Sequence, residues 1–203
     1  MHQPNFDIYS IGHSTHSEEQ FSALLKQADV NAIADVRSSP SSRHFPHFSQ
    51  SELKRWLRQD SVSYVFLGKE LGGRPSSPSL FRNGVADYEA MAATRMFADG
   101  LERLIKGAES HRVAMMCSEH DPLDCHRCLL VARQLAERGL TVGHILPRGE
   151  ISSHEQIEER MLKLEGLNAD DFFAPRPERL ANAYRQRNMK VAYSENLPSA
   201  FAG

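Results

Sequence analysis

The sequence predicts an α/β fold: a single three-layer domain of Rossmann-like type, with a mostly parallel sheet of about five strands flanked by helices. Short apolar segments rich in Val, Ile and Ala alternate with amphipathic segments along the chain, which is typical of a parallel sheet covered on both faces. The 203 residues, of which 40% are apolar and 25% charged, suffice for one core without disulfides. We expect residues 1–166 to form this domain and residues 167–203 to be a C-terminal extension packed on it.

Each element has its own local signal. Apolar runs predict strands over residues 6–11, 30–36, 63–68, 112–117 and 141–146. The first helix starts at Ser17, because Ser17 and Gln20 have the spacing of a capping box. A second helix starts at Ser49 with Glu52 three residues on. Further helices are predicted over residues 87–104, 125–139 and 152–166, with the glycine-rich loop LGGRP before the first of these and a C-terminal helix that packs through Leu180 and Tyr184.

The composition limits which partners and which cellular compartment we expect for the protein. The net charge is −2, so no global field draws the protein to nucleic acid or to anionic lipid. No run of about 18 apolar residues predicts a membrane span, and the N-terminus lacks the basic start and apolar stretch of a signal peptide. We therefore expect a cytoplasmic protein with reduced thiols and no membrane partner. The last thirty or so residues are locally basic, which predicts either solvated arginines or a weakly supported contact with nucleic acid.

Ligands of open parallel sheets bind beyond the carboxyl ends of the strands. The predicted strand ends carry most of the unusual polar residues and glycines of the chain, and part of this convergence is automatic because polar residues favour loops. The candidate ligand-binding residues at this edge are His13, Ser14, Arg37, Gly72, Gly73 and Arg127. Asp35 follows an apolar run directly and is a candidate general base, or it is the partner of an Asp35–Arg37 surface pair.

All three cysteines lie in the stretch CSEHDPLDCHRC from Cys117 to Cys128. Asp124 is placed to cap a helix that begins at Cys125, where the helix dipole and Arg127 favour a thiolate, so Cys125 is the best candidate nucleophile. The alternative is that Cys125 and Cys128 belong to an apolar helix face. Another alternative is a zinc or iron site on the three cysteines with His120 and His126 nearby. Tyrosine-phosphatase chemistry is not expected, because Cys117 lies ten residues before Arg127.

Several motifs together resemble domain-of-unknown-function family 488: IGHST, DVRSSPSSR, YVFLGKELGGRP, VADYEAMA and MCSEHDPLDCHRCLLVARQL. The resemblance runs from about residue 8 to residue 193. The family's motif positions in this chain are Gly12, His13, Ser14, Asp35, Arg37, Pro40, Gly68, Leu71, Gly72, Gly73, Cys117, Glu119, Cys125, His126 and Arg127. Cys128 departs from the family pattern, which weakens a family-wide site of three cysteines. The resemblance implies a bacterial, cytoplasmic α/β domain and no established reaction.

The leading hypothesis is an enzyme-like domain whose cleft binds an anionic ligand, such as a nucleotide or another phosphate-bearing molecule. Its candidate catalytic residues are Cys117, Glu119, Cys125, His126 and Asp35. One alternative is a metal or thiol-redox module on Cys117, Cys125 and Cys128, and another is a nucleic-acid-associated accessory protein. The cofactor, the substrate and whether the protein is an enzyme stay open.

Overall fold

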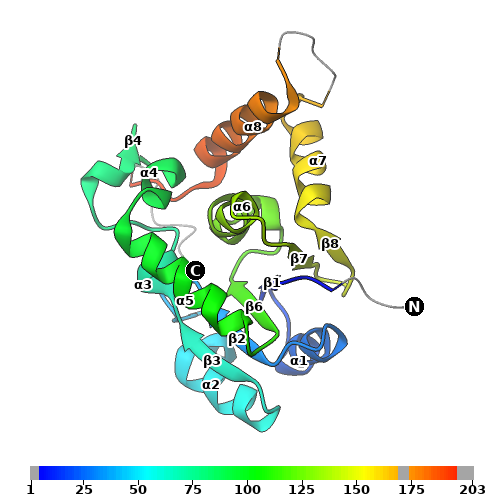
Figure 1. The fold of residues 1–203 in the computed structure, drawn as a ribbon. Coiled ribbons are helices and arrows are strands. Elements are labelled where there is room, and N and C mark those ends of the chain that lie inside the picture. The colour runs from blue at the N-terminus through cyan, green and yellow to red at the C-terminus, as the bar shows by residue number, and fades with distance from the viewer. Residues whose placement is uncertain (1–4, 169–173, 196–203) are drawn as a thin grey trace.

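The computed structural model describes residues 5–168 and 174–195, and it confirms the α/β fold (Figure 1). Six strands form one sheet in the order β3-β2-β6-β1-β7-β8, one more strand than expected. The first five in this order run parallel, and β8 pairs antiparallel with β7. The strand bounds are β1 Ile8–Gly12, β2 Ala32–Asp35, β3 Ser63–Phe66, β6 Val113–Cys117, β7 Val142–Ile145 and β8 Ile151–Ser153.

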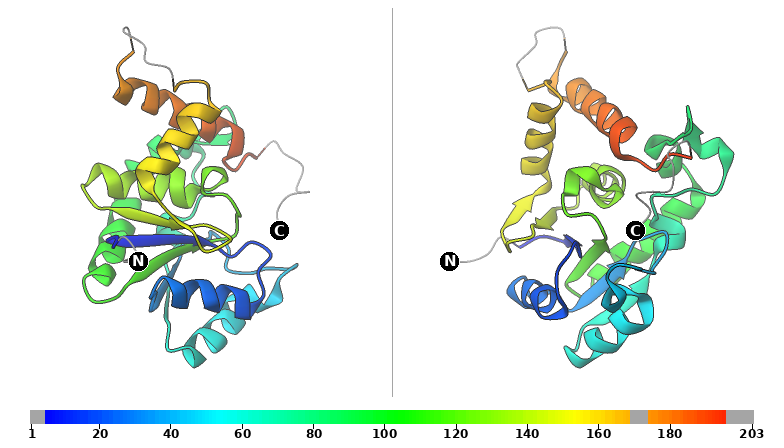
Figure 2. Two further views of the ribbon diagram at one scale, coloured as in Figure 1. Left: turned by 90° about the vertical axis from the view of Figure 1, so that its right-hand side faces the viewer. Right: turned by 180° about the vertical axis from the view of Figure 1, so that it is seen from behind.

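Helices cover both faces of the sheet because successive strand residues point to opposite sides. Helices α1 (Glu18–Gln27) and α2 (Gln50–Gln59) pack on one face through Phe21, Leu25, Leu53 and Trp56, and Figure 2 shows them together on that side. The opposite face is covered by α5 (Arg95–Ala108), α6 (Arg133–Glu137) and α7 (His154–Leu164). Strand β1 shows this alternation: Ile8 packs in the core beneath α5, α6 and α7, whereas the next residue, Tyr9, packs in the core beneath α1 and α2.

Local signals predict some helix starts correctly and others not. Ser17 and Gln20 form the expected capping box of α1. Ser49 precedes α2 but makes no side-chain cap, because its hydroxyl donates to the carbonyl of Ser42. The long helix predicted over 87–104 is two helices, α4 (Tyr88–Ala92) and α5, because Thr94 leaves helical geometry and caps α5 by accepting from the N–H of Phe97.

Short elements that have little periodicity were not predicted. They are β8, the antiparallel pair β4 (Phe81–Arg82) and β5 (Val85–Ala86), the helix α3 (Gly68–Leu71), and the 3-10 turns η1 (Pro46–Phe48), η2 (Pro78–Leu80) and η3 (Pro122–Asp124). Helix α3 begins at Gly68, where the predicted strand was expected to end, and takes only Leu71 from the glycine-rich loop LGGRP; residues 72–75 are a loop as predicted.

The helix after the cysteine loop begins in an unusual way. Its first part is a π-helix, η4 (Arg127–Ala132), which continues as α6. Cys125 stands at its start with extended backbone (φ −139°, ψ 139°), and the Cys125 carbonyl accepts from the N–H of Leu129. The Cys125 sulfur accepts from the N–H of Arg127 at 3.4 Å. Cys125 therefore takes the capping position predicted for Asp124, which instead lies in η3.

Helix α8 (Arg176–Val191) lies against α7 and buries Tyr184 as expected. Its basic side chains are engaged within the protein: Arg176 pairs with Glu159, Arg185 with Glu89, and Lys190 with Glu165. Residues 169–173 and 196–203 of the predicted extension lie outside the described residues. None of the helices in the described ranges has the length and apolar character needed to cross a membrane.

Candidate functional site

Three adjacent strands bring the predicted site residues to one edge of the sheet. Strand β6 lies between β1 and β2, Gly12 is level with Cys117, and Asp35 is level with Met116. The residues that follow these strand ends are therefore neighbours in space. His13 donates its backbone N–H to the carbonyl of Cys117 at 2.8 Å, which joins two of the ends directly.

Asp35 and Arg37 form a buried bidentate ion pair. Nε and Nη2 of Arg37 donate to the two oxygens of Asp35 at 2.9 and 2.6 Å, and both side chains are at most 3% exposed. The hydroxyl of Tyr64 donates to the same carboxylate at 2.8 Å. Asp35 is thus the counter-ion that holds Arg37, whose Nη1 is buried without a hydrogen-bond partner. A proton-transfer role for Asp35 stays a prediction.

His13 is a neutral ring next to this pair. Its Nδ1 donates to the carbonyl of Ser14 at 3.0 Å, and its ring stacks on Phe48 with centroids 4.3 Å apart. Burial, and then the positive charge of Arg37, lower the pKa of His13 to about 4. Since Nδ1 carries the proton, Nε2 is a hydrogen-bond acceptor, and it is buried with no partner.

Cys125 shares a proton with Glu119. Its sulfur lies 2.9 Å from Oε2 of Glu119, a separation that requires a proton between them. Burial alone raises the pKa of Cys125, but the hydrogen bond from Cys117 and the charges of Arg127 and His126 bring it well below its usual value. Burial and the charge of Cys125 raise the pKa of Glu119. These opposite directions favour a thiolate at Cys125 and a protonated carboxyl at Glu119.

Cys117 and His126 complete this thiolate centre. Burial, followed by the hydrogen bond with Cys125, raises the pKa of Cys117 well above its usual value, so Cys117 remains a thiol. Nδ1 of His126 lies 3.7 Å from the sulfur of Cys117 and 3.8 Å from that of Cys125. Nε2 of His126 donates to the carbonyl of Val36 at 2.8 Å, which fixes the orientation of the ring.

Arg127 is a buried cation that pairs with no carboxylate of the described residues. It is 0% exposed, and its Nη1 and Nη2 donate to the backbone carbonyls of Glu119 and His120 at 2.8 and 3.3 Å. Its Nε has no hydrogen-bond partner. The charged group with the largest effect on its pKa is Cys125, which raises it against the effect of burial. Arg127 and the Cys125 thiolate are therefore counter-ions.

Of Gly72, Gly73 and Ser14, only Gly73 is shown to pack against a residue of the thiolate centre. A Cβ on Gly73 would lie 2.7 Å from Cγ of His126, so the backbone there must lack a side chain for the ring to fit. A Cβ on Gly72 would lie 2.3 Å from the carbonyl oxygen of Gly68, so a side chain would not fit there either. The hydroxyl of Ser14 lies 3.1 Å from Nδ1 of His120 at the exposed rim.

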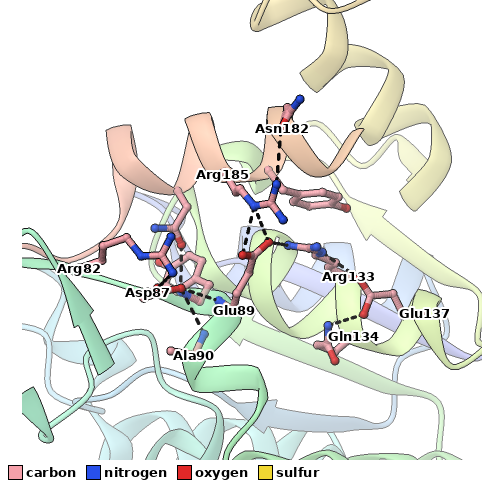
Figure 3. Close-up of polar contacts among 12 residues, drawn as sticks. Arg82, Asp87, Glu89, Ala90, Arg133, Gln134, Glu137, Asn182 and Arg185 are labelled. Carbon is pink, nitrogen blue, oxygen red and sulfur yellow. Dashed lines mark hydrogen bonds and ion pairs between the residues drawn. The ribbon is translucent and has the colours of Figure 1, made fainter. Parts of the chain in front are cut away.

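Two cavities of about 100 and 300 Å³ adjoin Tyr88 and Glu89; the first lies between α4, α6 and α8, and the second between α4, η4 and α6. Neither is lined by a cysteine. Figure 3 shows the charged residues around them: Glu89 lies between Arg133 and Arg185, and Arg82 pairs with Asp87. Each of these charged side chains is therefore already engaged in an ion pair within the protein.

Two groups among the described residues have the donor atoms to hold a metal ion. One is Cys117, Glu119, Cys125 and His126; the other is Cys128, His144 and His154. In each group the donor atoms lie within 4.8 Å of one another. Cys128 is therefore in a different group from Cys117 and Cys125, which differs from the three-cysteine site expected.

Sequence reasoning missed partners that carry no motif. The Val36 carbonyl that orients His126 is a backbone group, and no residue type marks it. Tyr64 is not among the predicted site residues, yet its hydroxyl holds Asp35. Phe48 is not among them either and is buried against His13 and Phe21.

A family model described as "Domain of unknown function DUF488" matches residues 17–134, which is more than half of the chain. The match includes Asp35, Arg37 and all three cysteines. Comparison with curated proteins and with solved structures gives no match. The chain therefore belongs to the family of the domain of unknown function DUF488.

Proposed function

We propose that the protein is an enzyme-like domain in which the Cys125 thiolate is the reactive group and a small anionic ligand binds beside it. The observation that carries this proposal is the buried charge of Arg127, which has no carboxylate partner among the described residues. An uncompensated buried charge destabilises a protein by roughly 3–5 kcal/mol. Ionisation of Cys125 removes that penalty, so the same arrangement that stabilises the fold creates a nucleophile.

The neighbouring groups suit nucleophilic catalysis. Glu119 holds a proton next to the sulfur and can give it to a leaving group, while His126 and Cys117 stabilise the thiolate. Arg37 offers an unused N–H at Nη1 and His13 an unused acceptor at Nε2. A phosphate or carboxylate with an adjacent hydroxyl would satisfy both, which favours a phosphate-bearing or nucleotide-like ligand.

Alkylation by iodoacetamide followed by mass spectrometry of the peptides tests the thiolate. We expect Cys125 to react before Cys117 and Cys128 at pH 7, and Arg127→Met to slow this reaction at least tenfold. The variant Cys128→Ser is the control and should leave the rate unchanged. Equal reactivity of Cys117 and Cys125, or no effect of Arg127→Met in a folded variant, would contradict the proposal.

A thermal-shift screen of nucleotides and phosphorylated metabolites tests the anion site. Any ligand that raises Tm should lose its effect in Arg37→Lys, which keeps a positive charge but lacks the bidentate fork. A ligand whose effect survives that substitution binds elsewhere. The basic residues of α8 are engaged within the protein, Arg179 with backbone carbonyls and the others in ion pairs, so we do not propose contact with nucleic acid.

A second candidate function, a zinc or iron centre, rests on the position of His126. Its Nδ1 is 3.7 and 3.8 Å from the two sulfurs, close to the roughly 3.6 Å expected between sulfur and nitrogen ligands of tetrahedral zinc. The hydrogen bond to Val36 is the outer contact that metal-bound histidines usually have. Elemental analysis after anaerobic purification tests this. Metal present in Cys128→Ser and lost in Cys125→Ser/Cys128→Ser supports the centre, because neither variant keeps the cysteine of the second donor group; Cys128→Ser protein without metal removes it.

A further inference from the structure

A second cluster of cysteine and histidine lies outside the thiolate centre. It consists of Cys128 on η4, His144 on β7 and His154 at the first residue of α7, all buried. Nε2 of His144 and Nδ1 of His154 face each other at 3.0 Å, and the sulfur of Cys128 lies within 4.8 Å of both rings' donor atoms. The function proposed above makes no use of these three side chains.

The outer nitrogen of each ring is also occupied. Nδ1 of His144 lies 2.7 Å from the hydroxyl of Ser10, and Nε2 of His154 lies 2.9 Å from that of Tyr184. Tyr184 donates onward to Glu158 at 2.9 Å, so its oxygen accepts from Nε2 of His154. The lone pair of His154 therefore points from Nδ1 toward His144 and Cys128.

His154 already has the arrangement found around metal-bound histidines, in which the inner nitrogen binds the ion and the outer N–H donates to an oxygen that is itself held in place, and His144 reaches it once its proton moves from Nε2 to Nδ1. We propose that Cys128, His144 and His154 form a binding site for a transition-metal ion of the zinc type. One thiolate and two imidazoles suit Zn²⁺, Co²⁺ and Cu⁺, whereas Mg²⁺ and Ca²⁺ require oxygen ligands.

Binding needs only small changes. Two nitrogens on a tetrahedral zinc are about 3.3 Å apart, so the two rings must separate by a few tenths of an ångström from their 3.0 Å contact. The proton on Nε2 of His144 moves to Nδ1, which then donates to Ser10, and the Cys128 thiol releases one proton to solvent. One metal–sulfur and two metal–nitrogen bonds form, and a water completes the coordination. No oxidant or reductant is required.

The proposed site would join a residue inside the segment matched by the family model to two residues outside that segment. Cys128 lies within residues 17–134, whereas His144 and His154 lie beyond them. A bound ion would tie η4 to β7 and to the start of α7, and through Tyr184 to α8. It would therefore stabilise the packing of the C-terminal helices on the sheet.

The test uses Cys117→Ser/Cys125→Ser protein, in which Cys128 is the only thiol, since the chain has three cysteines. After chelator treatment, this protein is titrated anaerobically with Co²⁺ and, separately, with Zn²⁺ and Cu⁺. We expect one equivalent of Co²⁺ to bind with sulfur-to-cobalt charge-transfer absorption, and Zn²⁺ to displace it. Added Zn²⁺ should raise Tm by several degrees.

The matched control is the thiol-free protein that also carries Cys128→Ser, a change of one atom that should leave the fold intact by circular dichroism. This control should lack the charge-transfer band and should bind Co²⁺ at least tenfold more weakly than the Cys128-only protein. Absence of stoichiometric binding to the Cys128-only protein, or equal affinity of the thiol-free protein, would overturn the proposal. Because both proteins lack Cys125, neither result depends on the proposed thiolate enzyme.

Discussion

Acidification should destabilise the protein through His13, because this ring is buried in its neutral form. The perturbation is a change from pH 7.5 to pH 5.0, applied to the wild type and to His13→Asn. The pKa of His13 is about 4 in the folded protein, lowered first by burial and then by Arg37, against 6.5 without these effects. The unfolded chain therefore takes up the proton first. Stability is fully present above about pH 6.5 and falls as the pH decreases toward about 4.

The magnitude follows from the size of the shift. A difference of about 2.5 pKa units corresponds to about 3.4 kcal/mol when protonation is complete, of which about 2 kcal/mol is lost by pH 5. Urea denaturation followed by circular dichroism at both pH values measures this loss. We expect the wild type to lose about 2 kcal/mol more than His13→Asn. The comparison is of changes with pH, so the lost stacking of His13 on Phe48 cancels. Equal losses in the two proteins would refute the reasoning.

Two further predictions concern the buried Asp35–Arg37 pair and the packing of Gly73 against His126. Arg37→Met should cost roughly 3–5 kcal/mol by leaving Asp35 buried without its partner, and adding Asp35→Asn should restore part of that loss in urea denaturation. Additive losses would show that the pair does not act as a unit. Gly73→Ala should cost about 1–3 kcal/mol, since its Cβ would lie 2.7 Å from His126. Gly107→Ala is the control and should be neutral or slightly stabilising, because only Val113 approaches, at 4.0 Å; similar Tm changes in both variants would contradict this.

The parallel sheet could be predicted because its signals are local. Apolar strands of the right length and the capping box at Ser17 appear within a few residues of sequence. The break between α4 and α5 was missed because the residues on both sides of Thr94 favour helix, and a single cap outweighs that propensity. Strand β8 is too short to show alternation and depends on its pairing with β7.

The convergence of Asp35, Arg37 and Cys117 could also be predicted, since the ends of parallel strands meet at one edge. The separation of Cys128 from Cys117 could not, because it depends on how the helix winds after Cys125. The pairing of His144 with His154 is a contact between a strand and a helix that no spacing in the sequence indicates. The free Nη1 of Arg37 is likewise a property of the packed structure alone.

The π-helix η4 is equivalent to an α-helix that has gained one residue. The wider winding of the π turn takes up that extra residue, so the apolar residues of α6 keep their contacts while Cys125 and Arg127 stay at the sheet edge. If the same residues wound as a regular α-helix, Cys125 and Arg127 would rotate by about 100° relative to α6 and leave that edge. One π turn therefore lets a single helix both hold the domain together and place its chemistry, and deletion of one residue between positions 129 and 131 should restore regular winding without moving either part.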